Sequence, residues 1–174
     1  MATLKEIKKA FFALSQKEQE TIIKEIYGFS KDIKSFLNVR LLGDGEKQYI
    51  EQITKASESM TPKGRPKMIK VTTVNSILSK AKKSKVSKET LCEMEWIAFD
   101  GYMTFLNDYG GGPESYENKI YDHLKNYLLL LMEIGSTEEQ NDKIDEVRKY
   151  LRRHTNMYYD DIWELFEEIT GESV

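Results

Sequence analysis

Residues 89–109 are the segment richest in apolar side chains, and they constrain the fold more than any other part of the sequence. On a helical wheel, their apolar side chains spread round most of the circumference instead of lying on one stripe. These side chains are Leu91, Cys92, Met94, Trp96, Ile97, Ala98, Phe99, Tyr102, Met103, Phe105 and Leu106. Such a helix is stable only when other helices surround it, so we expect residues 89–109 to form the central helix of the fold.

The remaining segments are predicted to be amphipathic helices that cover this central helix. Thr3 with Glu6 and Ser15 with Glu18 match the capping box that starts a helix, and Ser30 is placed to cap a third. We expect this third helix to bury Ile33, Phe36 and Leu37. Later apolar residues recur at helical spacing in residues 49–60, 74–81, 116–131, 144–151 and 162–169.

No segment shows the sustained alternation of apolar and polar residues that predicts a half-buried strand. We therefore expect a single all-α domain over residues 1–174, with eight or nine helices. Its helices either stack as an irregular α-solenoid or close into a bundle around residues 89–109, and the periodicity is compatible with both.

The length of 174 residues is sufficient for a substantial core, since a chain of this size buries roughly 70% of its unfolded surface. The single cysteine, Cys92, lies among apolar residues and predicts a buried thiol in a reducing compartment. The longest apolar run, residues 127–132, is too short to span a bilayer. We expect a cytoplasmic protein without membrane contact.

Charge is unevenly distributed along the chain, although the net charge is only −3. Residues 61–88 contain nine basic residues and no acidic one, which leaves 17 of the 26 basic residues and all 29 acidic residues elsewhere. The basic residues are Lys63, Arg65, Lys67, Lys70, Lys80, Lys82, Lys83, Lys85 and Lys88. This basic segment predicts a surface that binds a partner, or a solvated face that meets the protein's own acidic surface.

Three places in the sequence carry a family resemblance. They are the opening helix pair with Leu4, Leu14, Ser15, Glu18 and Tyr27, the junction Gly64, Arg65, Pro66 and Lys67 before a helix, and the apolar helix around residues 94–105. In these features the chain resembles an uncharacterised family of small, all-helical bacterial proteins with a domain of unknown function. The resemblance implies a helical fold, and it implies no activity and no site.

Candidate catalytic and metal-binding residues are few. The two histidines, His123 and His154, are 31 residues apart, and without a cysteine cluster or an HExxH pattern they predict no metal site. We interpret both as surface or capping residues. Cys92 lacks the neighbours that activate a nucleophile, and a close approach of Glu93 would raise the pKa of its thiol. Asp100 is the buried polar candidate, with a structural hydrogen bond as its expected role.

The sequence therefore favours a non-enzymatic helical protein that binds a protein partner and needs no cofactor. One alternative is nucleic-acid binding through residues 61–88, because clustered lysines release counterions from phosphates. Aromatic residues are absent from that segment, so it offers no base stacking, which makes this alternative weaker. A third hypothesis is an enzyme whose carboxylates come together only in three dimensions.

Overall fold

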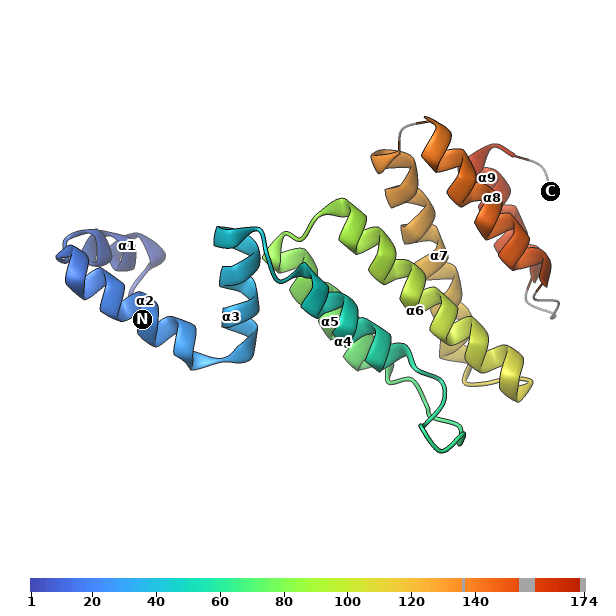
Figure 1. Cartoon of the computed structure of the whole chain (residues 1–174), viewed down its shortest axis with the longest axis horizontal. Coiled ribbons are helices and arrows are strands. Elements are labelled where there is room, and N and C mark those ends of the chain that lie inside the picture. The colour runs from blue at the N-terminus through green and yellow to red at the C-terminus, as the bar shows by residue number, and fades with distance from the viewer. Residues whose placement is uncertain (136, 154–158, 173–174) are drawn as a thin grey trace. The chain divides into compact units, whose positions relative to one another are not determined.

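The computed structural model describes residues 1–135, 137–153 and 159–172. The helices group into two compact units, Met1–Gly45 and Glu46–Val174, and the single domain over residues 1–174 stays a prediction. The N-terminal unit contains α1 (Leu4–Phe12), α2 (Gln16–Phe29), α3 (Lys31–Leu37) and a π-helix, η1 (Asn38–Leu42) (Figure 1). The C-terminal unit contains α4 (Glu46–Ser57), α5 (Val71–Ser84), α6 (Lys88–Tyr109), α7 (Glu114–Ile134), α8 (Thr137–Arg153) and α9 (Tyr159–Thr170).

The all-α prediction is confirmed. Across the described residues there are nine α-helices and no β-strand, apart from one isolated backbone bridge between Met60 and Pro66. None of the helices in these residues is long and apolar enough to cross a membrane.

Helix α6 is the centre of the C-terminal unit, as its apolar wheel predicts. It packs against α4, α5 and α7, and Figure 1 shows it between the α4–α5 pair and α7. Met94, Ala98, Phe99 and Tyr102 have no exposed surface. Gly101 lets α4 approach closely, because a Cβ atom at this position would overlap the carbonyl and side chain of Ser57.

The start of α6 is fixed by a carboxylate from α4. The Glu46 carboxylate accepts hydrogen bonds from the Ser87 backbone N–H at 2.6 Å, the Ser87 hydroxyl at 2.7 Å and the Thr90 hydroxyl at 2.5 Å. Ser87 is also the N-cap of α6, since its side chain accepts from the Thr90 backbone N–H. This network sets the direction in which α6 leaves the turn after α5.

The N-terminal unit has almost no core. The capping boxes at Thr3 and Ser15 are both formed, so its helices begin where the sequence predicts. Neither α1 nor α2 buries a single residue, however, and only Ser35 and Val39 are buried in the rest of the unit.

The expected burial of the third helix is therefore wrong. Phe36 is exposed, and Ile33 and Leu37 are half-buried. Three short helices enclose too little volume to cover their own apolar faces. As a result Phe12 and Phe29 remain 73% and 84% exposed.

Candidate functional site

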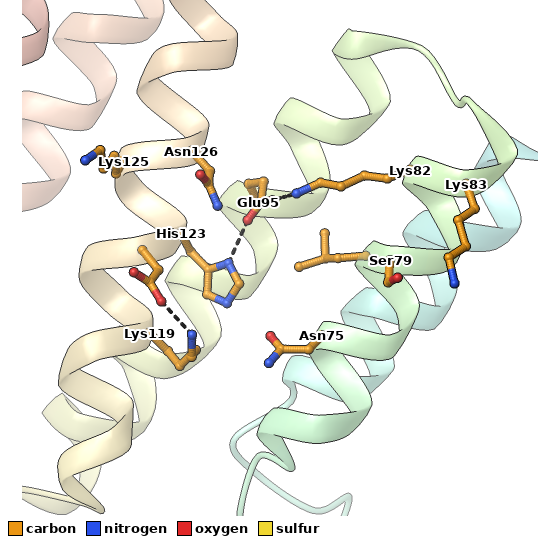
Figure 2. Close-up of a pocket in the computed structure, with 11 residues that line it drawn as sticks. Asn75, Ser79, Lys82, Lys83, Glu95, Lys119, His123, Lys125 and Asn126 are labelled. Atoms are coloured by element: carbon orange, nitrogen blue, oxygen red, sulfur yellow. Dashed lines mark hydrogen bonds and ion pairs between the residues drawn. The ribbon is translucent and has the colours of Figure 1, made fainter.

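A pocket of about 530 Å³ opens between α5, α6 and α7 in the C-terminal unit. Figure 2 shows Glu95 between His123 and Lys82, with Asn75 and Asn126 facing the same space and Lys83 and Lys125 extending away from it. Its lining residues are Asn75, Leu78, Ser79, Lys82, Lys83, Glu95, Lys119, Asp122, His123, Lys125 and Asn126. The volume lies in the range of about 300–1,000 Å³ that is typical of small-molecule sites.

Glu95, on α6, is the only buried carboxylate in the part of the chain that the structure describes, with 0% of its surface exposed. Phe99 and Tyr102 follow it by four and seven residues, so all three lie on the same face of the helix. This is the apolar face that packs into the core, and a carboxylate there is costly unless other groups pair with it.

His123 supplies the first partner, from the buried face of α7. Its Nδ1 lies 2.6 Å from Glu95 Oε2, and 3% of the residue is exposed. The Tyr102 ring is stacked parallel to the imidazole, at 5.8 Å between ring centroids. Because an ionised carboxylate can only accept hydrogen bonds, Nδ1 carries the proton and donates it to Glu95.

Lys82, on α5, supplies the second partner. Its Nζ lies 3.1 Å from Glu95 Oε1, and 52% of its side chain is exposed. Burial alone would raise the pKa of Glu95, but the hydrogen bond and charge of His123 and the ammonium group of Lys82 outweigh it. The pKa of Glu95 therefore lies below its usual value, and the carboxylate is ionised at neutral pH.

The second imidazole nitrogen of His123 has no partner. Nε2 is buried and forms no hydrogen bond with any described residue, and the same holds for the hydroxyl of the stacked Tyr102. An unsatisfied buried polar atom typically costs about 1–3 kcal/mol. Since His123 lines the pocket, the simplest way to satisfy Nε2 is a polar group of a molecule that occupies the pocket.

The rim of the pocket is predominantly basic. Lys83 on α5 and Lys125 on α7 form no ion pair within the described residues, whereas Lys119 is paired with Asp122 at 2.5 Å. Asn75, Ser79 and Asn126 add neutral donors and acceptors. The lining carries four lysines against two carboxylates, so the pocket is electrostatically suited to a negatively charged molecule.

The nine basic residues of residues 61–88 differ in their surroundings. Lys82 and Lys83 line the pocket, and two others pair with the protein's own carboxylates: Lys67 with Glu58 at 3.0 Å and Lys88 with Glu133 at 2.8 Å. The remaining members are Lys63, Arg65, Lys70, Lys80 and Lys85, of which Lys80 is half-buried and the rest are exposed. The pocket draws its other lysines from α7, outside the basic segment.

Asp100 is half-buried rather than buried, and the Tyr150 hydroxyl donates to its Oδ1 at 2.6 Å. Asp100 lies at the margin of the α6 face that packs into the core, whereas Glu95 lies within it. The interpretation of His123 as a surface or capping residue is also wrong, because it follows Ile120 by three residues and precedes Tyr127 by four on the buried face of α7. This spacing was the available signal. His154 lies outside the described residues.

A second cavity, of about 420 Å³, lies between α6, α7 and α8 and is lined by Cys92, Trp96 and Tyr127 among others. The Cys92 thiol is 3.7 Å from the Tyr127 carbonyl oxygen. Burial raises the pKa of Cys92 to about 11, so the thiol is protonated at neutral pH. Cys92 is therefore a packing residue and not an activated nucleophile.

Neither cavity resembles a metal centre, since no group of three or more His, Cys, Asp or Glu residues suited to a metal ion occurs in the described residues. No protein-family model, curated protein or solved structure matches the chain. The resemblance to an uncharacterised bacterial family thus stays a prediction, and any function must be argued from the geometry.

Proposed function

We propose that this protein binds a small anionic molecule in the pocket between α5, α6 and α7. The observation that carries the proposal is the unpartnered Nε2 of His123, which is buried beneath a rim of lysines. A buried nitrogen without a hydrogen-bond partner favours a ligand with a polar group, and the positive charge of the lysines favours a negatively charged ligand.

The charged residues of the pocket have two roles, namely to neutralise Glu95 and to attract an anion. Glu95 is already neutralised by Lys82 and His123, so it does not repel an anion as an isolated carboxylate would. Lys82 and Lys119 come from opposite walls, α5 and α7, and each ammonium group keeps N–H donors beyond its contact with Glu95 or Asp122, whereas Figure 2 shows Lys83 and Lys125 extending away from His123. A negatively charged group placed between these walls would receive charge-assisted hydrogen bonds from both sides.

The test is isothermal titration of the full chain with inorganic phosphate, sulfate and citrate at low salt. We compare the wild type with two double variants of equal net charge. Lys82→Gln with Lys119→Gln removes the ammonium groups that face the pocket, and Lys63→Gln with Lys70→Gln removes exposed lysines outside it.

The pocket variant should weaken binding of the anion that binds tightest by at least about tenfold, because each lost hydrogen bond to a charged group contributes about 1.5–3 kcal/mol. The control variant should bind like the wild type. Failure of all three anions to bind the wild type would disprove the proposal, and so would equal weakening in both variants, which indicates unspecific attraction.

Protein binding through the N-terminal unit is a second candidate function, favoured by the apolar surface of that unit. A groove of about 350 Å³ between α2 and η1 is lined by Ile23, Tyr27, Leu37, Leu41 and Leu42, together with three polar residues. Large apolar patches of this kind mark interaction surfaces.

The paired change of Leu41→Ser and Leu42→Ser tests this second function, because both leucines are more than two-thirds exposed. Light scattering after size exclusion should show self-association in the wild type, which this variant abolishes. A wild type that stays monomeric at high concentration would refute binding between copies of this chain.

Nucleic-acid binding through residues 61–88 receives less support, since their charges are dispersed and partly paired. A band shift at low salt that is lost in the Lys63→Gln, Lys70→Gln variant but kept in the pocket variant would favour it over the anion site.

A further inference from the structure

The second cavity, between α6, α7 and α8, differs in character from the anion pocket. Its volume is about 420 Å³, which is enough for a small organic molecule. Much of its wall is apolar or aromatic, with Trp96 from α6, Tyr127, Leu131 and Ile134 from α7, and Val147 from α8. Residues spaced by three or four positions share a helix face, so the three α7 residues form one continuous stripe. The cavity therefore suits a ligand with an apolar body.

Two aromatic rings contact each other in this wall, where α6 meets α7. The ring centroids of Trp96 and Tyr127 are 5.0 Å apart, and the Trp96 ring also contacts Phe99 at 5.2 Å and Tyr150 at 5.1 Å. Trp96 is half-buried, so these contacts hold a ring that is still partly exposed. The faces of aromatic rings carry partial negative charge and attract a cation within about 6 Å of the ring centroid. This wall thus favours a cationic ligand over an anionic one.

The charged groups that line the cavity are mainly negative. Glu89 and Glu93 on α6 and Glu146 on α8 stand against one ammonium group, that of Lys143. The Lys143 ammonium group is already paired, since its Nζ lies 3.0 Å from Oε1 of Glu139, which does not line the cavity. The cavity therefore attracts positive charge, whereas the anion pocket attracts negative charge.

Two of these carboxylates lie close to the aromatic wall. Glu93 precedes Trp96 by three residues, so the carboxylate and the indole share a face of α6. Burial raises the pKa of Tyr127, and the negative charge of Glu146 raises it further, an effect that requires this carboxylate to lie near the phenol. One cation can therefore interact with a carboxylate and with an aromatic face at the same time.

We infer that this cavity binds an amphipathic organic cation, with its ammonium group at Glu93, Glu146 and the Trp96 ring and its apolar body against the α7 stripe. The carboxylates by themselves do not form a metal site, because no group of three or more His, Cys, Asp or Glu residues suited to a metal ion occurs in the described part of the chain. Carboxylates beside an apolar and aromatic wall instead match a ligand that is both charged and apolar. The site is independent of the anion pocket.

Two ligands with the same apolar body separate the effect of charge from apolar attraction. At about pH 7, 4-phenylbutylamine is a cation and 4-phenylbutanol is neutral. Isothermal titration of the full chain at low salt should show the amine binding at least about fivefold more tightly than the alcohol, because only the ammonium group interacts favourably with the carboxylates and the indole face.

Two double variants of equal net charge test the carboxylates. Glu93→Gln with Glu146→Gln removes two negative charges from the cavity, and Glu164→Gln with Glu168→Gln removes two from α9, outside it. The first variant should lower the preference for the amine over the alcohol by at least about threefold, and the second should keep the wild-type preference. All four glutamates are exposed, so both variants should fold, and thermal melts verify this.

Trp96 reports where the amine binds. It lines the cavity, whereas the second tryptophan of the sequence, Trp163, lies on α9. In a Trp163→Phe variant, addition of the amine should change the tryptophan emission with the affinity that titration calorimetry gives for the wild type. Calorimetric binding without any change in Trp96 emission would place the amine elsewhere and overturn the inference.

The other outcomes are equally decisive. Equal affinity for amine and alcohol, equal loss of preference in the two glutamine variants, or absence of amine binding at millimolar concentration would each overturn the inference. None of these results bears on the anion pocket. Its Lys82→Gln, Lys119→Gln variant should bind the amine like the wild type, and loss of amine binding in that variant would show that the two sites are not independent.

Discussion

Replacing Glu95 with alanine should lower the free energy of unfolding by about 3–5 kcal/mol, the usual cost of removing one partner from a buried ion pair. The substitution deletes the acceptor 2.6 Å from His123 Nδ1 and leaves an imidazole that is 3% exposed with both nitrogens unpaired. Loss of the Lys82 contact adds little, because that side chain is 52% exposed and exposed pairs contribute only about 0–1 kcal/mol.

Glu95→Gln separates the hydrogen bond from the charge. Its amide oxygen can still accept from His123 and its volume is nearly unchanged, so we expect a loss of only about 1–2 kcal/mol. Glu93→Ala is the matched control, since Glu93 is exposed on the same helix and its loss should change stability by less than about 0.5 kcal/mol.

The assay is urea unfolding followed by tryptophan fluorescence, with thermal melts as a second measure. For a chain of this size each kcal/mol shifts the melting temperature by about 2–4 °C, so Glu95→Ala should melt at least about 6 °C lower. Replacing both members of the pair, by Glu95→Met with His123→Leu, should cost less than Glu95→Ala alone, because no polar atom is then left unpaired. If Glu95→Ala and Glu93→Ala are equally stable, the reasoning about the buried pair is refuted.

Three further predictions concern pH, the cysteine and a helix contact. Because the folded-state pKa of Glu95 is lowered, its ionised form contributes stability above the ordinary carboxyl pKa of about 4.3, and this contribution is lost as pH falls through the lower folded-state pKa. Urea unfolding midpoints should therefore fall more steeply from about pH 5 to 2 for the wild type than for Glu95→Gln. Parallel curves for the two proteins would contradict this prediction. Cys92, whose pKa is about 11, should react with a disulfide reagent at about pH 8 far more slowly in the native protein than in denaturant, and similar rates would show that the thiol is accessible. Gly101→Ala should destabilise the protein by about 2 kcal/mol or more because its Cβ would overlap Ser57, whereas Gly28→Ala, which meets no atom within 4 Å, should be neutral or slightly stabilising in melting experiments.

The sequence was most informative about local structure. Ser15 and Glu18 form the capping box that their spacing predicts, and the apolar wheel of residues 89–109 corresponds to α6 in the middle of the C-terminal unit. Both predictions depend on interactions within a few residues, or on how evenly apolar groups surround one helix. Periodicity is sufficient to show both.

The sequence was least informative about the candidate site. Glu95 and His123 are 28 residues apart and belong to two helices, and each looks like an ordinary polar residue beside apolar neighbours. Asp100 was predicted to be the buried carboxylate because of its apolar neighbours. It lies instead at the margin of the buried face, where the Tyr150 hydroxyl donates a hydrogen bond to it. The burial of these two carboxylates differs because of which face of α6 packs against α7, and the tertiary structure decides that face.

The basic segment, residues 61–88, is a second case in which the sequence did not predict where side chains lie. Its composition indicated either a surface that binds a partner or a face that meets the protein's own acidic surface. Lys67 and Lys88 form ion pairs with carboxylates of the protein, whereas Lys82 and Lys83 line the pocket. Proximity along the chain does not place charged side chains on one face, because a helix directs successive residues about 100° apart.

By itself, then, the sequence determined that this chain is all-helical, where the first three helices begin, and that residues 89–109 lie at a core, because these properties follow from local capping and from the distribution of apolar groups. The tertiary structure decided the division into two units and the burial of the Glu95–His123 pair beneath lysines from α5 and α7. Those features depend on which helix faces meet, and the free energy of that choice is spread over contacts between residues far apart in the sequence.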